Sequence, residues 1–191
     1  MTVTPLASQT DVVAAIGRAL TTEEAARIGA ILDKASEQFR RASGQLFTPG
    51  TSTVRLKSNG GRVRLPQRPV DTITSVKDDA GNLVAYTQFK STLTTTLRSD
   101  QFVIVDYTHG ASEVPDEVRL CIAEVGKRVL EIPATARSGL SQFSETDGPF
   151  SKSGTFAAWA VGGQTMLSPD DVALAKSYRV AMGSLIVMSS R

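Results

Sequence analysis

Residues 53–65 read TVRLKSNGGRVRL, and apolar and basic side chains alternate along them with a period of two. Such alternation is typical of strands that bury one face. The pair Asn59-Gly60 suits the positive backbone dihedrals of a tight turn, so the stretch predicts a β-hairpin. Four apolar side chains would face the core: Val54, Leu56, Val63 and Leu65. The basic side chains would lie on the opposite face.

The period of two continues beyond this hairpin. We expect five or six short antiparallel strands between residues 53 and 108, with Pro66 and Pro69 marking where the ribbon leaves the sheet. The segment TQFKSTLTTTLRS fits either one bent strand or two, so the strand count stays open by one or two.

Helical patterns lie on both sides of the sheet region. Thr10 is the expected cap of a short helix that Gly17 closes. Thr21 and Glu24 have the spacing of a capping box, and the helix that they begin carries one apolar stripe as far as Gly44. The stripe consists of Ile28, Ile31, Leu32, Ala35, Phe39 and Ala42.

Two further helices follow the sheet region. The third helix is expected to begin at Pro115 and to end before Pro133, with an apolar side of Val118, Cys121, Ile122, Val125 and Val129. Ser168 and Pro169 begin a last helix, which we expect to run towards Ser190. Residues 134–166 are rich in Ser, Gly and Thr and lack a sustained period.

These elements predict an α+β fold in which a helical bundle carries an inserted small antiparallel β-sheet domain. The bundle would contain two N-terminal helices, a return helix and a C-terminal helix. We expect a helical core over 1–133 with the sheet at about 51–108, an extended loop or arm over 134–166, and a C-terminal helix and tail over 167–191.

Composition narrows the class of protein. The chain has 191 residues, 41% of them hydrophobic, and its formal net charge is +2. No stretch has the features of a signal peptide or of a membrane span, so we expect a soluble protein made in a cytoplasm. The lone Cys121 cannot form an intrachain disulfide, and we expect it to be a small core residue.

The sequence shows no motif for catalysis, metal binding or a cofactor. His109 is the single histidine, and we interpret it as a polar residue where a strand meets a loop rather than as a catalytic base. Acidic pairs occur at helix starts or in a turn, where the helix dipole or the turn geometry explains them. The glycine-rich run NGGRVR lacks the phosphate-binding pattern GxxxxGK[ST]. We therefore expect no catalytic, metal or cofactor site, and no enzyme.

Basic residues are unevenly distributed. Between Arg40 and Val70 there are seven basic residues and no acidic one. Two interpretations stay open: a solvated face that protects an edge strand, or a surface along which DNA passes by phosphate neutralisation. The candidates for DNA contact are Arg55, Lys57, Arg62, Arg64 and Arg68. Few aromatic residues lie near them in the sequence, which disfavours sequence-specific or single-strand binding.

The order of several stretches resembles the head-to-tail connector, or adaptor, proteins of long-tailed bacteriophages, especially those of actinobacterial hosts. The resemblance covers roughly residues 6–180, and it depends on a succession of motifs. These are a capped helix pair, GGRVRLPQRPV, YTHG followed by VPDEVR, and SETDGPFS ahead of LSPDDVALAKSYR. The chain departs from the family in a longer insert at 151–166 and in an apolar C-terminal tail.

The resemblance implies a structural virion protein of the neck, assembled in the host bacterial cytoplasm. Family members form a ring, of twelve copies, below the portal at the capsid vertex. The ring extends the DNA channel and offers a platform to the next tail-joining protein. The implied partners are therefore other copies of the chain, the portal, the next connector and double-stranded DNA bound without sequence specificity, and no membrane.

On this interpretation two surfaces would contact neighbouring proteins. The candidates for portal contact are Tyr178, Arg179, Met182, Leu185 and Ile186. The candidates for contact with a neighbouring subunit or the next neck protein are Phe143, Phe150, Phe156 and Trp159. The helix over residues 22–43 and the helix after Pro115 would form the core and part of the subunit interface. The alternative is a small basic DNA-associated protein that acts without forming a ring.

Overall fold

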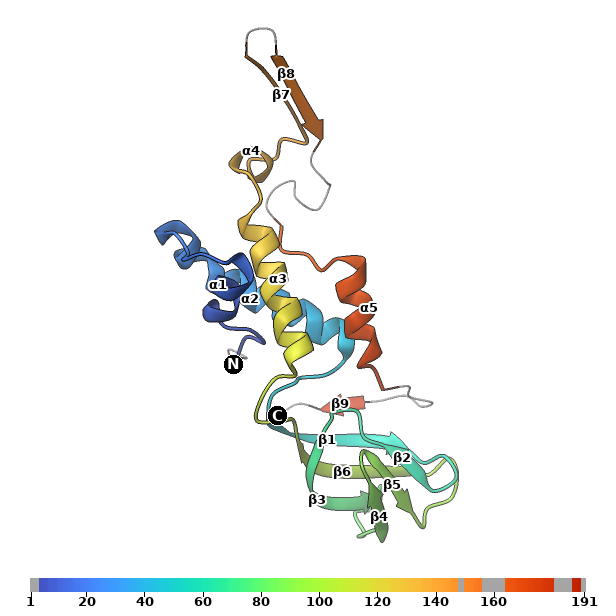
Figure 1. Ribbon diagram of the computed structural model, residues 1–191. Coiled ribbons are helices and arrows are strands. Elements are labelled where there is room, and N and C mark those ends of the chain that lie inside the picture. Colours follow the sequence, from blue (N-terminus) through green and yellow to red (C-terminus); the bar gives the residue numbers. More distant parts are fainter. Residues whose placement is uncertain (1–3, 148–149, 156–163, 181–186, 190–191) are drawn as a thin grey trace. The chain divides into compact units, whose positions relative to one another are not determined.

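The computed structural model describes residues 4–147, 150–155, 164–180 and 187–189 (Figure 1). Its contacts divide the chain into two compact units. A helical unit comprises Met1–Phe39 and Pro115–Ala175, and a sheet unit comprises Arg40–Val114 and Lys176–Arg191. The predicted α+β class, with a small antiparallel β-structure inserted into a helical protein, is confirmed.

Helix α1 (Gln9–Ile16) opens the helical unit. The prediction that Thr10 caps it is wrong, because Ser8 occupies the N-cap position. The Ser8 hydroxyl accepts from the Asp11 N–H, and the Asp11 carboxylate accepts from the Ser8 N–H at 2.7 Å. A complete capping box thus begins the helix two residues earlier than expected. Gly17 closes it, as predicted.

Helix α2 (Thr22–Ser43) begins at the predicted capping box. The Glu24 carboxylate accepts from the Thr21 N–H at 2.8 Å, and the Glu24 N–H donates to the Thr21 hydroxyl at 3.3 Å. Its predicted apolar stripe is buried from Ile28 to Phe39, and Ala42 is half-buried. The long helix therefore forms as its sequence pattern indicates.

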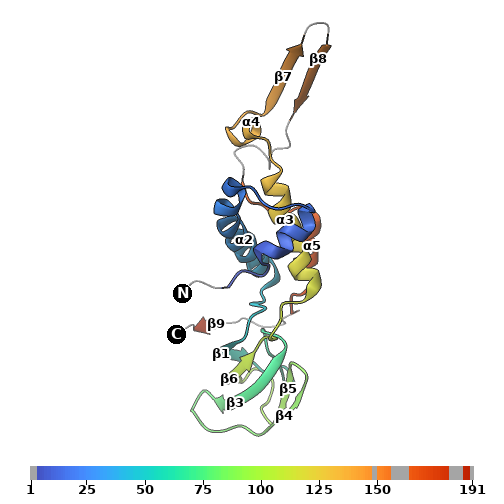
Figure 2. The ribbon, with the colours of Figure 1, turned by 60° about the vertical axis from the view of Figure 1, so that its left-hand side comes forward.

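Helix α3 (Asp116–Leu130) packs against both preceding helices (Figure 2). The tightest point is Gly126, where an added Cβ would lie 3.1 Å from Val12 and 3.3 Å from Ile28. A glycine in mid-helix costs about 1 kcal/mol relative to alanine. Here the missing side chain leaves room for Val12 of α1 and Ile28 of α2. On the same helix Val118, Ile122, Val125 and Val129 are buried.

Helix α5 (Pro169–Ser177) starts as predicted but ends early. The Ser168 hydroxyl accepts from the Asp171 N–H at 3.2 Å, and the Asp171 carboxylate accepts from the Ser168 N–H at 2.8 Å. The same carboxylate forms an ion pair with Arg128 of α3 and so holds α5 against it. The expected continuation of this helix towards Ser190 is wrong, because residues 187–189 form strand β9 (Val187–Ser189).

Residues 134–155 contain regular structure that their composition did not predict. Helix α4 (Ala134–Arg137) is followed by strands β7 (Gln142–Asp147) and β8 (Phe150–Thr155). The two strands pair antiparallel, from Gln142 opposite Thr155 to Asp147 opposite Phe150. Part of the expected arm is therefore a β-hairpin.

The sheet unit contains six strands between residues 50 and 109, in line with the prediction. They are β1 (Gly50–Lys57), β2 (Arg62–Arg64), β3 (Val70–Asp78), β4 (Tyr86–Phe89), β5 (Thr92–Thr95) and β6 (Phe102–His109). One sheet has the order β3-β6-β1-β9 and the other has the order β2-β5-β4 (Figure 1). The open segment TQFKSTLTTTLRS thus forms two strands, β4 and β5.

The predicted hairpin over residues 53–65 has its turn but lacks its ladder. Asn59 and Arg62 exchange backbone hydrogen bonds at 3.0 and 3.1 Å around Gly60 and Gly61, whose φ values are 60° and 78°. Beyond this bridge the strands separate, because β1 pairs with β6 and β2 pairs with β5. The turn therefore passes the chain from one sheet to the other.

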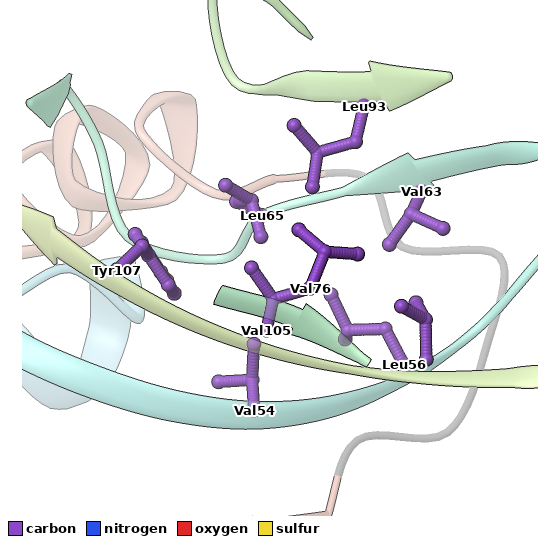
Figure 3. Close-up of a cluster of buried hydrophobic side chains, with 9 residues drawn as sticks. Val54, Leu56, Val63, Leu65, Val76, Leu93, Val105 and Tyr107 are labelled. Atoms are coloured by element: carbon purple, nitrogen blue, oxygen red, sulfur yellow. The ribbon is translucent and has the colours of Figure 1, made fainter. Parts of the chain in front are cut away.

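The two sheets bury one apolar cluster (Figure 3). It includes the four side chains predicted to face inwards, Val54, Leu56, Val63 and Leu65, each at most 3% exposed. Strands β3, β5 and β6 supply the other members, which are Val76, Leu93, Val103, Val105 and Tyr107. Since inward residues alternate with outward ones, this core fixes which way each basic side chain of β1 and β2 points.

Candidate functional site

The basic candidates on β1 are neutralised by acidic partners. Arg55 donates from Nε and Nη2 to the carboxylate of Asp79 at 2.8 and 2.7 Å, and its guanidinium lies 3.7 Å from the ring centroid of Phe102. Hydrogen bonds from Arg55 lower the pKa of Asp79. Lys57 Nζ lies 2.5 Å from the Asp100 carboxylate. These two cations therefore offer DNA little net charge.

The basic candidates on β2 differ from those on β1. Arg62 and Arg64 are both exposed and flank the buried Val63. In the register of the sheet they stand opposite Thr94 and Thr92 of β5. Among the described residues neither has an acidic partner. The sequence placed all four basic residues on one ribbon, whereas the structure divides them between two sheets.

Arg68 is exposed, but it makes hydrogen bonds within the sheet unit. Its Nη2 donates to the backbone carbonyl of Tyr178 at 2.9 Å, and its N–H donates to the side chain of Gln45 at 3.0 Å. The ring of Tyr178 packs edge-on against Phe47, with centroids 5.2 Å apart. Arg179 donates from Nε to the carbonyl of Ala42 at 2.7 Å. The segment after α5 is thus anchored within the sheet unit.

Two of the portal-contact candidates, Tyr178 and Arg179, accordingly make contacts within their own chain. The other three, Met182, Leu185 and Ile186, lie outside the described residues. Among the neck-contact candidates, Phe143 and Phe150 belong to the β7–β8 hairpin, where the backbone of Phe143 pairs with that of Gly154. Phe156 and Trp159 also lie outside the described residues. Among the described candidates, the structure brings Arg68 together with Tyr178, through the hydrogen bond to the Tyr178 carbonyl.

Two buried glutamines connect the end of α2 to the loop after β2, and sequence reasoning missed both. Gln45 donates from Nε2 to the carbonyl of Pro66 at 2.7 Å. Gln67 accepts from the Leu46 N–H at 2.9 Å and donates to the carbonyl of Gly44 at 3.0 Å. Each is 4% exposed. A polar residue beside an apolar run is a weak signal, so only the long-range pairing reveals them.

His109 is the last residue of β6, and its side chain is buried. It is 2% exposed, and its Nε2 lies 2.8 Å from the Ser52 hydroxyl. Burial lowers the pKa of His109 and so favours the neutral imidazole. Burial raises the pKa of its neighbour Tyr107 to about 12, so this phenol stays protonated at neutral pH. In the described parts of the chain no three His, Cys, Asp or Glu side chains gather as a metal site would require.

The charge of the molecule is divided between its two units. Summed over the sequence, the sheet unit has 13 basic and 6 acidic residues, hence a formal charge of +7. The helical unit has 8 basic and 13 acidic residues, hence −5. The small total of +2 conceals this division. Charge segregation on this scale favours contacts between unlike surfaces of separate copies.

Comparisons with known proteins find likeness in structure alone. No protein-family model matches the chain, and no curated protein matches its sequence. A chain from the neck of an empty GTA particle, computed with C6 symmetry, superposes with a TM-score of 0.50 at 13% identity. That match covers 95% of this chain and 93% of the other. A chain from the neck of a native GTA particle, computed with C12 symmetry, gives a TM-score of 0.45 at 15% identity over 96% and 99% of the two chains.

The protein shares its fold with a neck protein of a GTA particle. The match extends over nearly the full length of both chains, so it includes the helical unit and the sheet unit together. Among the described residues, no helix is long and apolar enough to cross a membrane.

Proposed function

We propose that the protein is a structural, non-enzymatic component of the neck of a tailed phage or phage-like particle. The observation that carries the proposal is the fold likeness to a GTA-particle neck protein over 95% of the chain. The motif order that resembles phage connectors supports the same role. In this proposal twelve copies of the chain form a ring, as in the connectors that it resembles. The ring lies below the portal, joins capsid to tail and extends the DNA channel.

Ring formation fits the distribution of charge. A cyclic ring uses a heterologous interface, in which one face of each subunit meets a different face of the next. The +7 sheet unit and the −5 helical unit supply two unlike surfaces within one chain. Contacts between like surfaces would bring equal charges together, which is unfavourable.

The test of this role is assembly with the portal. Purified protein mixed with portal rings should give a closed ring on the portal, visible by negative-stain imaging and measurable as a discrete mass increase. A variant truncated after Arg179 should attach poorly, because Met182, Leu185 and Ile186 are then missing. Normal attachment of the truncated chain would show that the tail is not part of the portal contact. Failure of the full chain to bind or to form rings would refute the connector role.

Within the proposed channel, Arg62 and Arg64 are the residues that contact DNA. Neither has an acidic partner among the described residues, so both can attract phosphates without a competing ion pair. Replacing both with glutamine should weaken duplex binding and reduce the slope of log K against log salt by about 0.9 for each phosphate that is no longer neutralised. The matched control is Arg55→Gln, because Asp79 already neutralises that side chain. Equal effects of the two changes would contradict this assignment.

The same two arginines favour one alternative function, a small DNA-associated protein that acts as a monomer. That protein would bind duplex DNA with strong salt dependence in the absence of any ring. Replacement of Arg62 and Arg64 with glutamine would weaken the binding. Sedimentation of the protein with portal rings and, separately, with DNA distinguishes the two functions, since only a connector assembles into a closed ring on the portal.

A further inference from the structure

Strand β4 is an open, apolar edge of the sheet unit. It pairs with β5 on one side, and within the described part of the chain no strand pairs with its other side. All four of its residues are exposed. Leu83, Tyr86 and Phe89 remain 79%, 39% and 75% exposed. Proteins normally cover or charge such an edge, so these residues indicate a surface that a partner buries.

Basic side chains lie near Phe89 at the end of this edge. Lys90 Nζ lies 5.8 Å from the ring centroid of Phe89. Arg64, Thr92 and Phe89 form one row across the three strands of the sheet. The whole sheet unit has a formal charge of +7. A partner for the edge must therefore tolerate large apolar side chains and should be acidic around them.

The outer face of α2 has room for large apolar side chains and carries acidic residues beside them. Glu23, Ala26, Ala30 and Asp33 follow one another at helical spacing, and all four are exposed. Ala26 and Ala30 project little from the backbone, so an aromatic ring can pack closely between the flanking carboxylates. Among the described residues, neither Glu23 nor Asp33 has an ion-pair partner. The helical unit around them has a formal charge of −5.

We propose that the β4 edge of one copy docks on the outer face of α2 in the next copy. Leu83 and Phe89 would lie over the two alanines, and Lys90 would pair with a flanking carboxylate. Pairing of two β4 edges would bring +7 against +7, whereas edge-to-helix docking brings +7 against −5. The inference rests on the proposed ring and names the heterologous contact that builds it. Arg62 and Arg64 of β2, at the far edge of the same sheet, stay accessible to DNA.

Two variants, each blocking one side of the contact, test the inference. The edge variant carries Leu83→Ser and Phe89→Ser, and the helix variant carries Ala26→Arg and Ala30→Arg. All four positions are exposed, so both variants should fold, which circular dichroism verifies. If one of them fails to fold, Phe89→Ser or Ala30→Arg alone replaces it. The matched control carries Leu120→Ser and Leu140→Ser, which remove two leucines that are 55% and 52% exposed elsewhere.

Sedimentation velocity over a concentration series gives the result. The wild type and the control should self-associate, and each blocked variant alone should associate at least about tenfold more weakly. An equimolar mixture of the two variants should form a heterodimer and nothing larger, because the mixture has one usable edge and one usable helix face per pair. This outcome is specific to a heterologous contact.

Other outcomes overturn the inference in distinguishable ways. Self-association of both variants at wild-type strength refutes the contact and leaves the ring proposal standing. Homodimers of the helix variant would show that two β4 edges pair with each other. Loss of duplex binding by the edge variant with unchanged assembly would assign the edge to DNA. A wild type that stays monomeric also refutes the contact. The ring proposal is then refuted only if the protein also fails to assemble on portal rings.

Discussion

Replacing Gln45 with leucine should destabilise the sheet unit while leaving its apolar core intact. The Gln45 side chain donates to the carbonyl of Pro66 at 2.7 Å and accepts from the N–H of Arg68 at 3.0 Å. It thereby fixes the backbone on both sides of Gln67, next to the arginine that binds the Tyr178 carbonyl. Leucine has a similar volume but can form neither hydrogen bond.

The magnitude follows from the burial of the two groups. An unsatisfied carbonyl at the buried Pro66 costs about 1–3 kcal/mol, and the partly buried N–H of Arg68 contributes about 0.5–1.5 kcal/mol more. Burial of the additional apolar surface of leucine offsets about 1 kcal/mol of this loss. The net loss in the free energy of unfolding should be about 1–3 kcal/mol, a sizeable part of a typical total of about 5–15 kcal/mol.

Urea unfolding followed by circular dichroism measures this loss, and hydrogen exchange of the Arg68 amide localises it. The control is Gln88→Leu, the same substitution at an exposed position of β4, which should change stability by less than about 0.5 kcal/mol. The Arg68 amide should exchange faster in Gln45→Leu and at the wild-type rate in Gln88→Leu. Equal stability of the two variants, or unchanged exchange at Arg68, would refute the reasoning.

Three further predictions concern stability and reactivity. A Cβ at Gly110 would lie 2.3 Å from the Thr48 carbonyl oxygen, so Gly110→Ala should cost more than about 3 kcal/mol in thermal or urea unfolding. Gly81→Ala, also at positive φ but in open space, should cost about 1 kcal/mol. Burial raises the pKa of Asp171, but the hydrogen bonds it accepts outweigh this and lower it. The Asp171 carboxylate therefore contributes to the free energy of unfolding above about pH 4, and this contribution is lost as pH falls. Asp171→Asn should reduce stability at pH 7 and make stability decline less steeply towards about pH 3. Burial, followed by the nearby carboxylate, raises the pKa of Cys121 to about 12, so a thiol reagent at pH 8 should react with the folded protein at least about 100-fold more slowly than with the unfolded chain.

The helices could be predicted from sequence because their determinants are local. Thr21 and Glu24 lie three residues apart and cap α2 as expected, and the stripe from Ile28 to Phe39 is buried. The start of α5 at Pro169 follows from the adjacent Ser168 in the same way. The wrong prediction for the N-cap of α1 was in error by only two residues. Ser8 rather than Thr10 has an acidic residue three positions later, which completes a capping box.

Strand pairing was harder to predict because it depends on residues far apart in the chain. The turn at Asn59-Gly60 is local and forms as expected. The partner of β1 is nevertheless β6, with Val54 opposite Val105, about 50 positions away. Side-chain alternation specifies which face of a strand is buried but not which strand lies beside it. Correct inward residues therefore coexist with a wrong hairpin.

The early end of α5 has a similar cause. The apolar sequence after Ser177 is compatible with more helix, and local propensity alone cannot exclude it. Tertiary contacts of the sheet unit fix the chain instead, because the Tyr178 ring packs on Phe47 while its carbonyl accepts from Arg68. Arg68 was a candidate for DNA contact on the basis of its charge. Its actual hydrogen bond is to a residue 110 positions away, which no sequence window contains.

The division of charge between the units predicts how salt should affect the two proposed interactions. Duplex DNA binding by Arg62 and Arg64 depends on phosphate neutralisation, so it should fall steeply with salt. The contact between copies combines attraction of unlike charges with burial of Leu83 and Phe89. Salt screens the charges over about 10 Å at 0.1 M but leaves the apolar contribution intact. Assembly should therefore survive salt concentrations that release DNA, because salt does not screen the burial of apolar surface.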